Sequence, residues 1–226
     1  YYEATRQPLY CLLLLFPLVA IYEFGTLMLR PVTLPGQQLV AQSAIQGLLG
    51  WFGASGSWLP AAVLLATLLG LHIASRRNWH VKLWVLPTMV VESVVLTLPL
   101  FVVVKLFLVA GGGGSDVREQ IILAIGAGIY EELVFRMFAI GAIVYLLDVG
   151  MKARQHISLS VAIGISALLF AACHFSPIGS NAPSWPQAIA LCVAGVYLGL
   201  VYVGRGLGVA AGCHAAFNLI LPLFAR

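Results

Sequence analysis

Seven long runs of apolar residues dominate this 226-residue chain. Each approaches the roughly 20 residues that an α-helix needs to cross the hydrocarbon core of a bilayer. The runs are Tyr10–Leu29, Trp58–Ser75, Leu83–Val109, Ile121–Leu147, Ile157–Phe175, Gln187–Val203 and Leu207–Phe224. We therefore predict an all-α fold, a polytopic transmembrane helix bundle with about seven spans.

The composition supports a membrane location. Hydrophobic residues make up 61% of the chain and charged residues only 9%, whereas soluble domains carry roughly 25% charged residues. The mean hydropathy is +1.00. The net charge of +4 is modest and resides mainly in short loops, which indicates a topology signal. We expect an integral, multi-pass protein whose partner is the lipid bilayer and not nucleic acid.

The stretch 37–56 is ambiguous because its apolar residues alternate with Gln and Ser. An interfacial or re-entrant helix is favoured there, and an eighth span is the alternative. With seven spans, ten loop and terminal cations divide seven to three between the two sides, which places the N-terminus inside. The majority side holds Arg6, Arg76, Arg77, Lys82, Lys152, Arg154 and Arg205, and the other holds Arg30, Arg118 and Arg226.

Three regions follow from these patterns. Residues 1–110 hold about three N-terminal spans, residues 111–120 form a Gly-rich loop, and residues 121–226 form the helix bundle that carries the polar motifs. The segment Gly111–Ser115 has the composition of a flexible linker, natural or engineered. Small residues spaced four apart, at Gly195/Gly199, Gly204/Gly208 and Gly208/Gly212, predict close helix packing in the last region.

Charged residues inside apolar runs need an explanation, because each costs roughly 2.5–3.5 kcal/mol at the bilayer centre. Glu23 and Lys105 lie near the ends of their runs and are expected to extend toward the interface. Glu92 lies deeper, and we expect it to pair with a basic group on another helix. The four cysteines all lie within apolar runs without a Cys-x-x-Cys spacing, which favours a packing role.

The fourth run places three charges within six residues, at Glu131, Glu132 and Arg136. Glu132 and Arg136 are four residues apart and can form an ion pair on one helix face. Glu131 points about 100° away from that pair and has no local partner. A carboxylate in this situation can serve as a general base when a water and a polarising group lie nearby.

Two further runs supply polar groups of the required kind. The fifth run carries Phe170 and, one turn later, His174; the seventh carries His214 and, one turn later, Asn218. A single histidine within the membrane most often makes one interhelical hydrogen bond. Two histidines, an asparagine and an unpaired glutamate on three helices would instead satisfy one another if they converge. We predict that they form one site.

These motifs, in this order, resemble those of the CPBP family (CAAX proteases and bacteriocin-processing enzymes, also called Abi). Its pattern is Glu-Glu-x-x-x-Arg, Phe-x-x-x-His and His-x-x-x-Asn, which here correspond to Glu131–Arg136, Phe170–His174 and His214–Asn218. The resemblance covers about Ile121–Leu221. It implies an intramembrane endopeptidase that resembles the type II CAAX prenyl endopeptidases.

The resemblance also implies a role for each residue. Glu131 and His174 would activate a water against a peptide bond, and His214 and Asn218 would stabilise the oxyanion. Glu132, Arg136 and Phe170 would support them. No cofactor is favoured, although Glu131, His174 and His214 could supply three ligands to a zinc ion with an open position. We favour the metal-free mechanism because the chain lacks His-Glu-x-x-His.

The expected partner is a peptide or protein substrate, lipid-modified or membrane-embedded, and a bacterial-type plasma membrane is the expected location. Two other functions remain as alternatives. One is a transporter or proton relay, since intramembrane Glu and His also carry protons; the absence of repeat symmetry in the sequence argues against it. The other is a non-catalytic immunity or chaperone-like membrane protein, against which the intact motifs argue.

Overall fold

The computed structural model describes residues 1–29, 39–107, 117–175 and 184–224, and the secondary-structure elements assigned there are all helices. In chain order they are α1 Tyr2–Thr5, α2 Pro8–Leu29, α3 Val40–Gly50, α4 Leu59–Ala74, α5 Val85–Val95, α6 Leu98–Phe107, α7 Val117–Glu131, the π-helix η1 Glu132–Ile140, α8 Gly141–Tyr145, the π-helix η2 Leu146–Gly150, α9 Gln155–Ala172, α10 Trp185–Arg205 and α11 Leu207–Phe224.

Each of the seven predicted runs contains an apolar helical segment. Five are long and apolar enough to cross a membrane: α2, the pair α5–α6, the continuous stretch Val117–Gly150, α9 and α10. The helices of the second and seventh runs, α4 and α11, are apolar but shorter. The prediction of an all-α polytopic helix bundle is confirmed.

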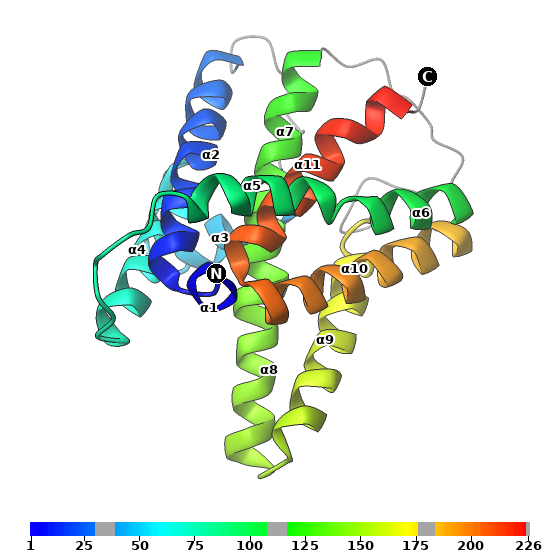
Figure 1. Ribbon diagram of the computed structural model, residues 1–226. Helices are drawn as coiled ribbons and strands as arrows, with labels where there is room; N and C mark the ends of the chain where they lie inside the picture. Colours follow the sequence, from blue (N-terminus) through cyan, green and yellow to red (C-terminus); the bar gives the residue numbers. More distant parts are fainter. Residues whose placement is uncertain (30–38, 108–116, 176–183, 225–226) are drawn as a thin grey trace.

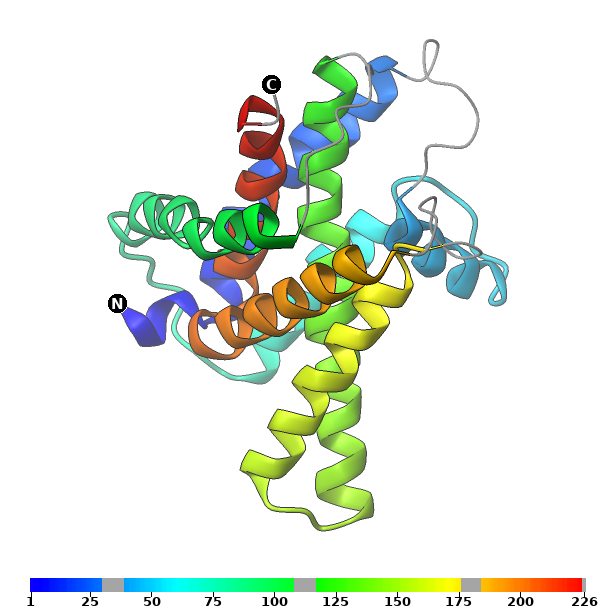
Figure 2. The ribbon, with the colours of Figure 1, turned by 90° about the vertical axis from the view of Figure 1, so that its right-hand side faces the viewer.

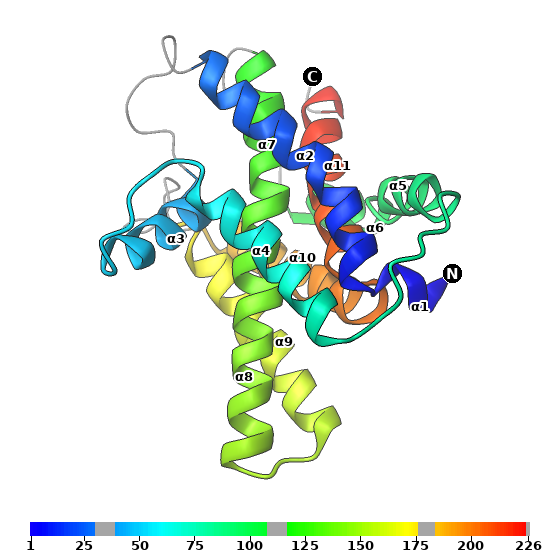
Figure 3. The ribbon, with the colours of Figure 1, turned by 90° about the vertical axis from the view of Figure 1, so that its left-hand side faces the viewer.

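The longest element runs from Val117 to Gly150 through α7, η1, α8 and η2 (Figure 1). At 1.5 Å per residue it is about 50 Å long, well beyond the roughly 30 Å of a hydrocarbon core. α9 returns alongside its lower half (Figure 2), in contact with η1 and α8. α11 packs against α7, the upper part of this element. α2 packs on the opposite side of α7, and α4 packs against α2 (Figure 3).

The third run is divided into α5 and α6 at Leu96 and Thr97. Pro99 lies in the first turn of α6, where it lacks a backbone N–H and its ring excludes a regular helix around the carbonyl four residues earlier. Together α5 and α6 lie across the long helix, as does α10 (Figure 1). This crossing arrangement was not anticipated from the sequence.

Glycines set the closest helix approaches. A Cβ at Gly195 or Gly199 would lie 2.9 Å or 3.0 Å from Ala167 or Ile163, so these two glycines let α10 pack directly on α9. Gly208 faces Cys11 and Met89, and Gly212 faces Ser93. The prediction of close packing holds for these four, whereas Gly204 has nothing within 4 Å.

Two predicted segments fall partly outside the described residues. In the stretch 37–56, α3 has 11 residues, about half of what a span needs, and its interfacial or re-entrant placement stays a prediction. In the predicted loop 111–120, residues 111–116 lie outside the described ranges, while residues 117–120 form the first turn of α7.

Candidate active site

The two neighbouring carboxylates occupy a change of helix geometry. Glu131 is the last residue of α7 and Glu132 the first of the π-helix η1. π-helical segments are frequent at functional sites because they re-aim side chains within a continuous helix. Glu131 keeps 12% of its side chain exposed, while Glu132 is fully buried. Glu131 is thus partly accessible, whereas Glu132 is not.

Glu132 joins two helices through its two oxygens. Its Oε1 accepts a hydrogen bond from Nδ1 of His214 on α11 at 2.9 Å, and its Oε2 lies 3.2 Å from Nε of the fully buried Arg136. The Arg136 nitrogens have no aligned hydrogen-bond partner among the described residues. Glu132 and Arg136 therefore form a close ion pair that is held by charge attraction and not by an aligned hydrogen bond.

The histidine rings can be assigned tautomers from their partners. Nδ1 of His174 lies 2.7 Å from the backbone carbonyl of Phe170, and a carbonyl only accepts, so Nδ1 is the donor. Nδ1 of His214 is likewise the donor to the Glu132 carboxylate. In the neutral form of each ring, Nε2 is then left with a free lone pair.

Both Nε2 atoms lie close to the same oxygen. Oε2 of Glu131 is 3.9 Å from Nε2 of His174 and 3.8 Å from Nε2 of His214. It is buried and has no hydrogen-bond partner among the described residues. These distances are too long for direct hydrogen bonds and suit a single molecule bridging the three groups. His174, with 28% of its side chain exposed, lies on the accessible side.

Phe170 is the common neighbour of the charged groups. Its ring contacts the rings of His174 at 4.6 Å and His214 at 5.9 Å between centroids. The guanidinium of Arg136 lies 4.5 Å from its ring centroid, a distance at which an aromatic face attracts a cation. Phe170 therefore contacts both histidine rings and the Arg136 guanidinium.

Ser166 was not among the predicted site residues. Its Oγ donates a 2.6 Å hydrogen bond to the backbone carbonyl of Phe135 in η1, which ties α9 to the π-helix behind the site. Ser166 and Phe170 are four residues apart on one face of α9, and His174 follows four residues later in the turn after the helix. That spacing is the signal in the sequence that could have identified Ser166.

Asn218 is placed differently from the other predicted residues. It lies one turn after His214 on α11, partly exposed, and makes no hydrogen bond to a described residue. The structure thus brings together Glu131, Glu132, Arg136, Phe170, His174 and His214. The role of Asn218 stays a prediction.

Glu23 and Glu92 have specific partners. Glu23, expected near the interface, accepts a 2.8 Å hydrogen bond from the hydroxyl of Tyr130, the residue before Glu131. This contact anchors α7 to α2 beside the site and was missed by the sequence analysis. Glu92 pairs with Arg205 on α10 through bonds of 2.5 and 2.7 Å, as expected.

Glu131, His174 and His214 are the candidate ligands of a metal ion. In the described part of the chain, no group of three His, Cys, Asp or Glu side chains is arranged to hold a metal ion. Zinc needs its ligand atoms about 2.0–2.2 Å from one point. The choice between a metal-free site and a zinc ion held by Glu131, His174 and His214 stays a prediction.

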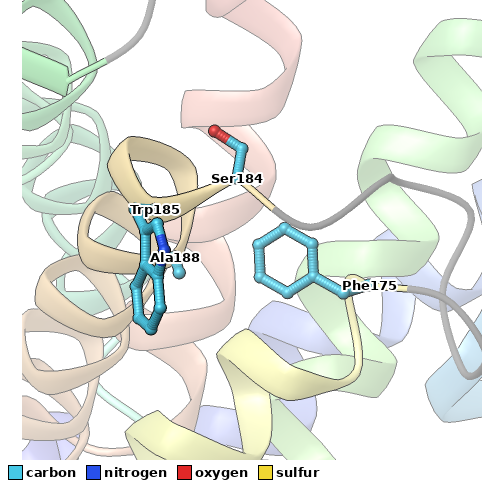
Figure 4. Close-up of a pocket in the computed structure, with 4 residues that line it drawn as sticks. All are labelled: Phe175, Ser184, Trp185 and Ala188. Atoms are coloured by element: carbon cyan, nitrogen blue, oxygen red, sulfur yellow. The ribbon is translucent and has the colours of Figure 1, made fainter.

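An apolar pocket begins at Phe175, the residue after His174. It has a volume of about 250 Å³ and is lined by Phe175, Ser184, Trp185 and Ala188. Figure 4 shows the aromatic rings of Phe175 and Trp185 on opposite sides of it, with Ser184 at the start of α10. The accessible side of the site is therefore bordered by an apolar surface.

Comparison with known proteins shows that part of this chain matches a protein family. Residues 115–220 match the family model described as type II CAAX prenyl endopeptidase Rce1-like. This range contains all three motifs of the site. A search of curated proteins and a search of solved structures each found no match. The match supports the family that the motifs indicated: over residues 115–220 the chain is similar to the CAAX protease-type membrane endopeptidases described as Rce1-like.

Proposed function

We propose that this chain hydrolyses a peptide bond at the membrane with a water activated by Glu131 and His174. The observation that carries the proposal is the convergence of Oε2 of Glu131 with the two histidine Nε2 atoms at 3.8 and 3.9 Å. All three atoms are acceptors when the histidines are neutral. A water would donate its two protons to Oε2 of Glu131 and Nε2 of neutral His174, which leaves Nε2 of His214 to serve as a donor when that ring is protonated.

The proposed chemistry needs no covalent enzyme intermediate. As the water oxygen bonds to the scissile carbonyl carbon, Glu131 takes its proton and His174 orients it. When the carbon–nitrogen bond breaks, the proton passes from Glu131 to the departing amine. Proton and bond changes then balance, and Glu131 returns as a carboxylate.

His214 is proposed to stabilise the oxyanion. A protonated imidazole would donate through Nε2 to the developing charge while Nδ1 stays bound to Glu132. The Glu132 carboxylate behind the ring would hold its orientation, as in other histidine–carboxylate pairs. Asn218 is proposed as a second donor, reached by rotation of its side chain. Donors of this kind are each worth about 10²–10³ in rate.

The substrate is proposed to be a peptide with an apolar or lipid-modified segment. The apolar pocket beside His174 would take a side chain or lipid group next to the scissile bond. Trp185 and Phe175 offer the largest apolar surfaces in it. We further propose a bacterial-type plasma membrane as the location, because the connections between the apolar runs are compact.

The test is peptide cleavage by protein reconstituted in proteoliposomes, with prenylated and unmodified peptide pools as probes and products detected by mass spectrometry. Glu131→Gln should lower cleavage about 10²–10⁴-fold, the usual contribution of a general base. Glu119→Gln is the matched control, since Glu119 lies in the first turn of the same helix. Equal rates for wild type and Glu131→Gln would contradict the proposal.

The same assay addresses the metal. The proposed mechanism predicts that wild-type cleavage is unchanged after dialysis against a zinc chelator and that added zinc does not increase it. A rate that falls on chelation and returns with stoichiometric zinc would replace the proposed mechanism with a metallopeptidase one.

A further inference from the structure

A basic pocket lies at the start of α2, beside the loop that joins α4 to α5. It has a volume of about 470 Å³, and its lining includes Tyr10, Arg77, His80, Lys82, Trp84 and Glu3. It lies among elements that the proposed catalysis does not use. Its chemistry therefore calls for a separate explanation.

The cations of this pocket have no carboxylate partners. Arg77 and Lys82 are exposed, and neither forms an ion pair within the described ranges. No carboxylate close to them in the sequence can neutralise them, because no Asp or Glu occurs between Glu23 and Glu92. Glu3 is the carboxylate that lines the pocket. Arg77 and Lys82 together carry one more charge than Glu3, and a protonated His80 would add another.

Neutral donors accompany the cations. The Tyr10 hydroxyl accepts a 2.9 Å hydrogen bond from the backbone N–H of Lys82, and its own proton has no acceptor among the described residues. The side-chain oxygen of Asn78, also in the lining, accepts from the backbone N–H of His80 at 3.0 Å, which leaves its amide N–H groups free. These two bonds shape the loop and keep two donors available for an anion.

The loop has the composition of a membrane–water boundary. Trp79, Leu83 and Trp84 are 58%, 76% and 56% exposed. Tryptophans gather at this boundary in membrane proteins, and basic pockets between spans on the positive side bind anionic lipid headgroups. We propose that this pocket binds the phosphate of an anionic phospholipid headgroup, held by Arg77 and Lys82 with Tyr10 as a neutral donor.

The proposal is tested by lipid retention in nanodiscs that contain phosphatidylcholine and phosphatidylglycerol. Native mass spectrometry of the released protein counts each lipid. Wild type should retain phosphatidylglycerol preferentially, and Arg77→Ala/Lys82→Ala should weaken that retention roughly 30-fold, from about 1 kcal/mol per cation near a membrane surface. The matched control is Lys152→Ala/Arg154→Ala, which removes the same two charges from the exposed connection between η2 and α9 and should leave retention unchanged.

Two further measurements complete the test. Glu3→Gln removes the opposing carboxylate and should strengthen phosphatidylglycerol retention. Inorganic phosphate at millimolar concentration should not displace the lipid if the headgroup is the ligand; displacement would show that free phosphate is the ligand instead. Equal retention by wild type and Arg77→Ala/Lys82→Ala would overturn the proposal, as would an equal loss in the Lys152/Arg154 control, which would indicate general surface charge.

Discussion

At the scale of the residue, the two adjacent glutamates have different surroundings. Glu131 keeps part of its side chain exposed, and its buried Oε2 lies near two imidazole nitrogens. Glu132 is fully buried and links His214 to Arg136. The sequence indicated the Glu132–Arg136 pair from its i, i+4 spacing. It gave no sign of the bond to His214, because that bond joins residues 82 positions apart.

Replacing Glu132 should separate structural from catalytic loss. Glu132→Gln leaves the Arg136 cation buried without a counter-charge, which typically costs about 3–5 kcal/mol of stability. In Glu132→Gln/Arg136→Met the cation is also removed, so thermal stability should largely return. Cleavage should stay low in both variants, because His214 has lost the carboxylate that orients its ring.

Thermal unfolding and peptide cleavage are measured on both variants in the same detergent. Recovery of cleavage together with stability in the double variant would mean that Glu132 serves only to neutralise Arg136. The proposed oxyanion role of His214 would then lose its support.

At the scale of the element, the site depends on how closely α7 and α11 approach. A Cβ at Gly128 would lie 2.6 Å from the backbone nitrogen and the Cβ of Ala215. Ala215 follows His214, so this contact sets the distance from His214 to the carboxylates. On the other side, Ser166 of α9 bonds to η1 through the carbonyl of Phe135. The site is thus fixed between two helix contacts.

Gly128→Ala should therefore lower activity and stability together. The added methyl meets backbone atoms, which cannot rotate away, and such overpacking costs about 1–3 kcal/mol. Gly141→Ala is the matched control on the same long helix, since a Cβ there meets nothing within 4 Å. The control should be neutral or slightly more stable, because alanine favours a helix over glycine. Cleavage rate and melting temperature are the measurements; equal behaviour of the two variants would contradict the packing argument.

At the scale of the whole molecule, the sequence was most informative where the signal is local. Apolar runs of about 20 residues predicted the helices, and the three motifs predicted the family. The crossing of α5, α6 and α10 over the long helix (Figure 1) depends on packing between distant segments, and no local pattern encodes it. The same holds for the bond between Glu23 and Tyr130, whose partners lie on different helices.

The π-helix η1 shows the same limit within a single run. An i, i+4 spacing is readable in the sequence at Glu132 and Arg136, but a change from α- to π-geometry between Glu131 and Glu132 is not. That change arises where Ser166 and Phe170 of α9 pack against η1. The pairing of Glu132 with Arg136 could therefore be predicted from the sequence, whereas the change of helix geometry between Glu131 and Glu132 could not.

The most direct test of the central claim is a double-mutant cycle on Glu131 and His174 in single-turnover peptide cleavage. Groups that act as one unit lose activity non-additively. If both residues activate the same water, Glu131→Gln/His174→Gln should be no slower than Glu131→Gln alone, with all three variants folded to the wild-type melting temperature. Losses that multiply, or a Glu131→Gln variant that cleaves at the wild-type rate, would contradict the account.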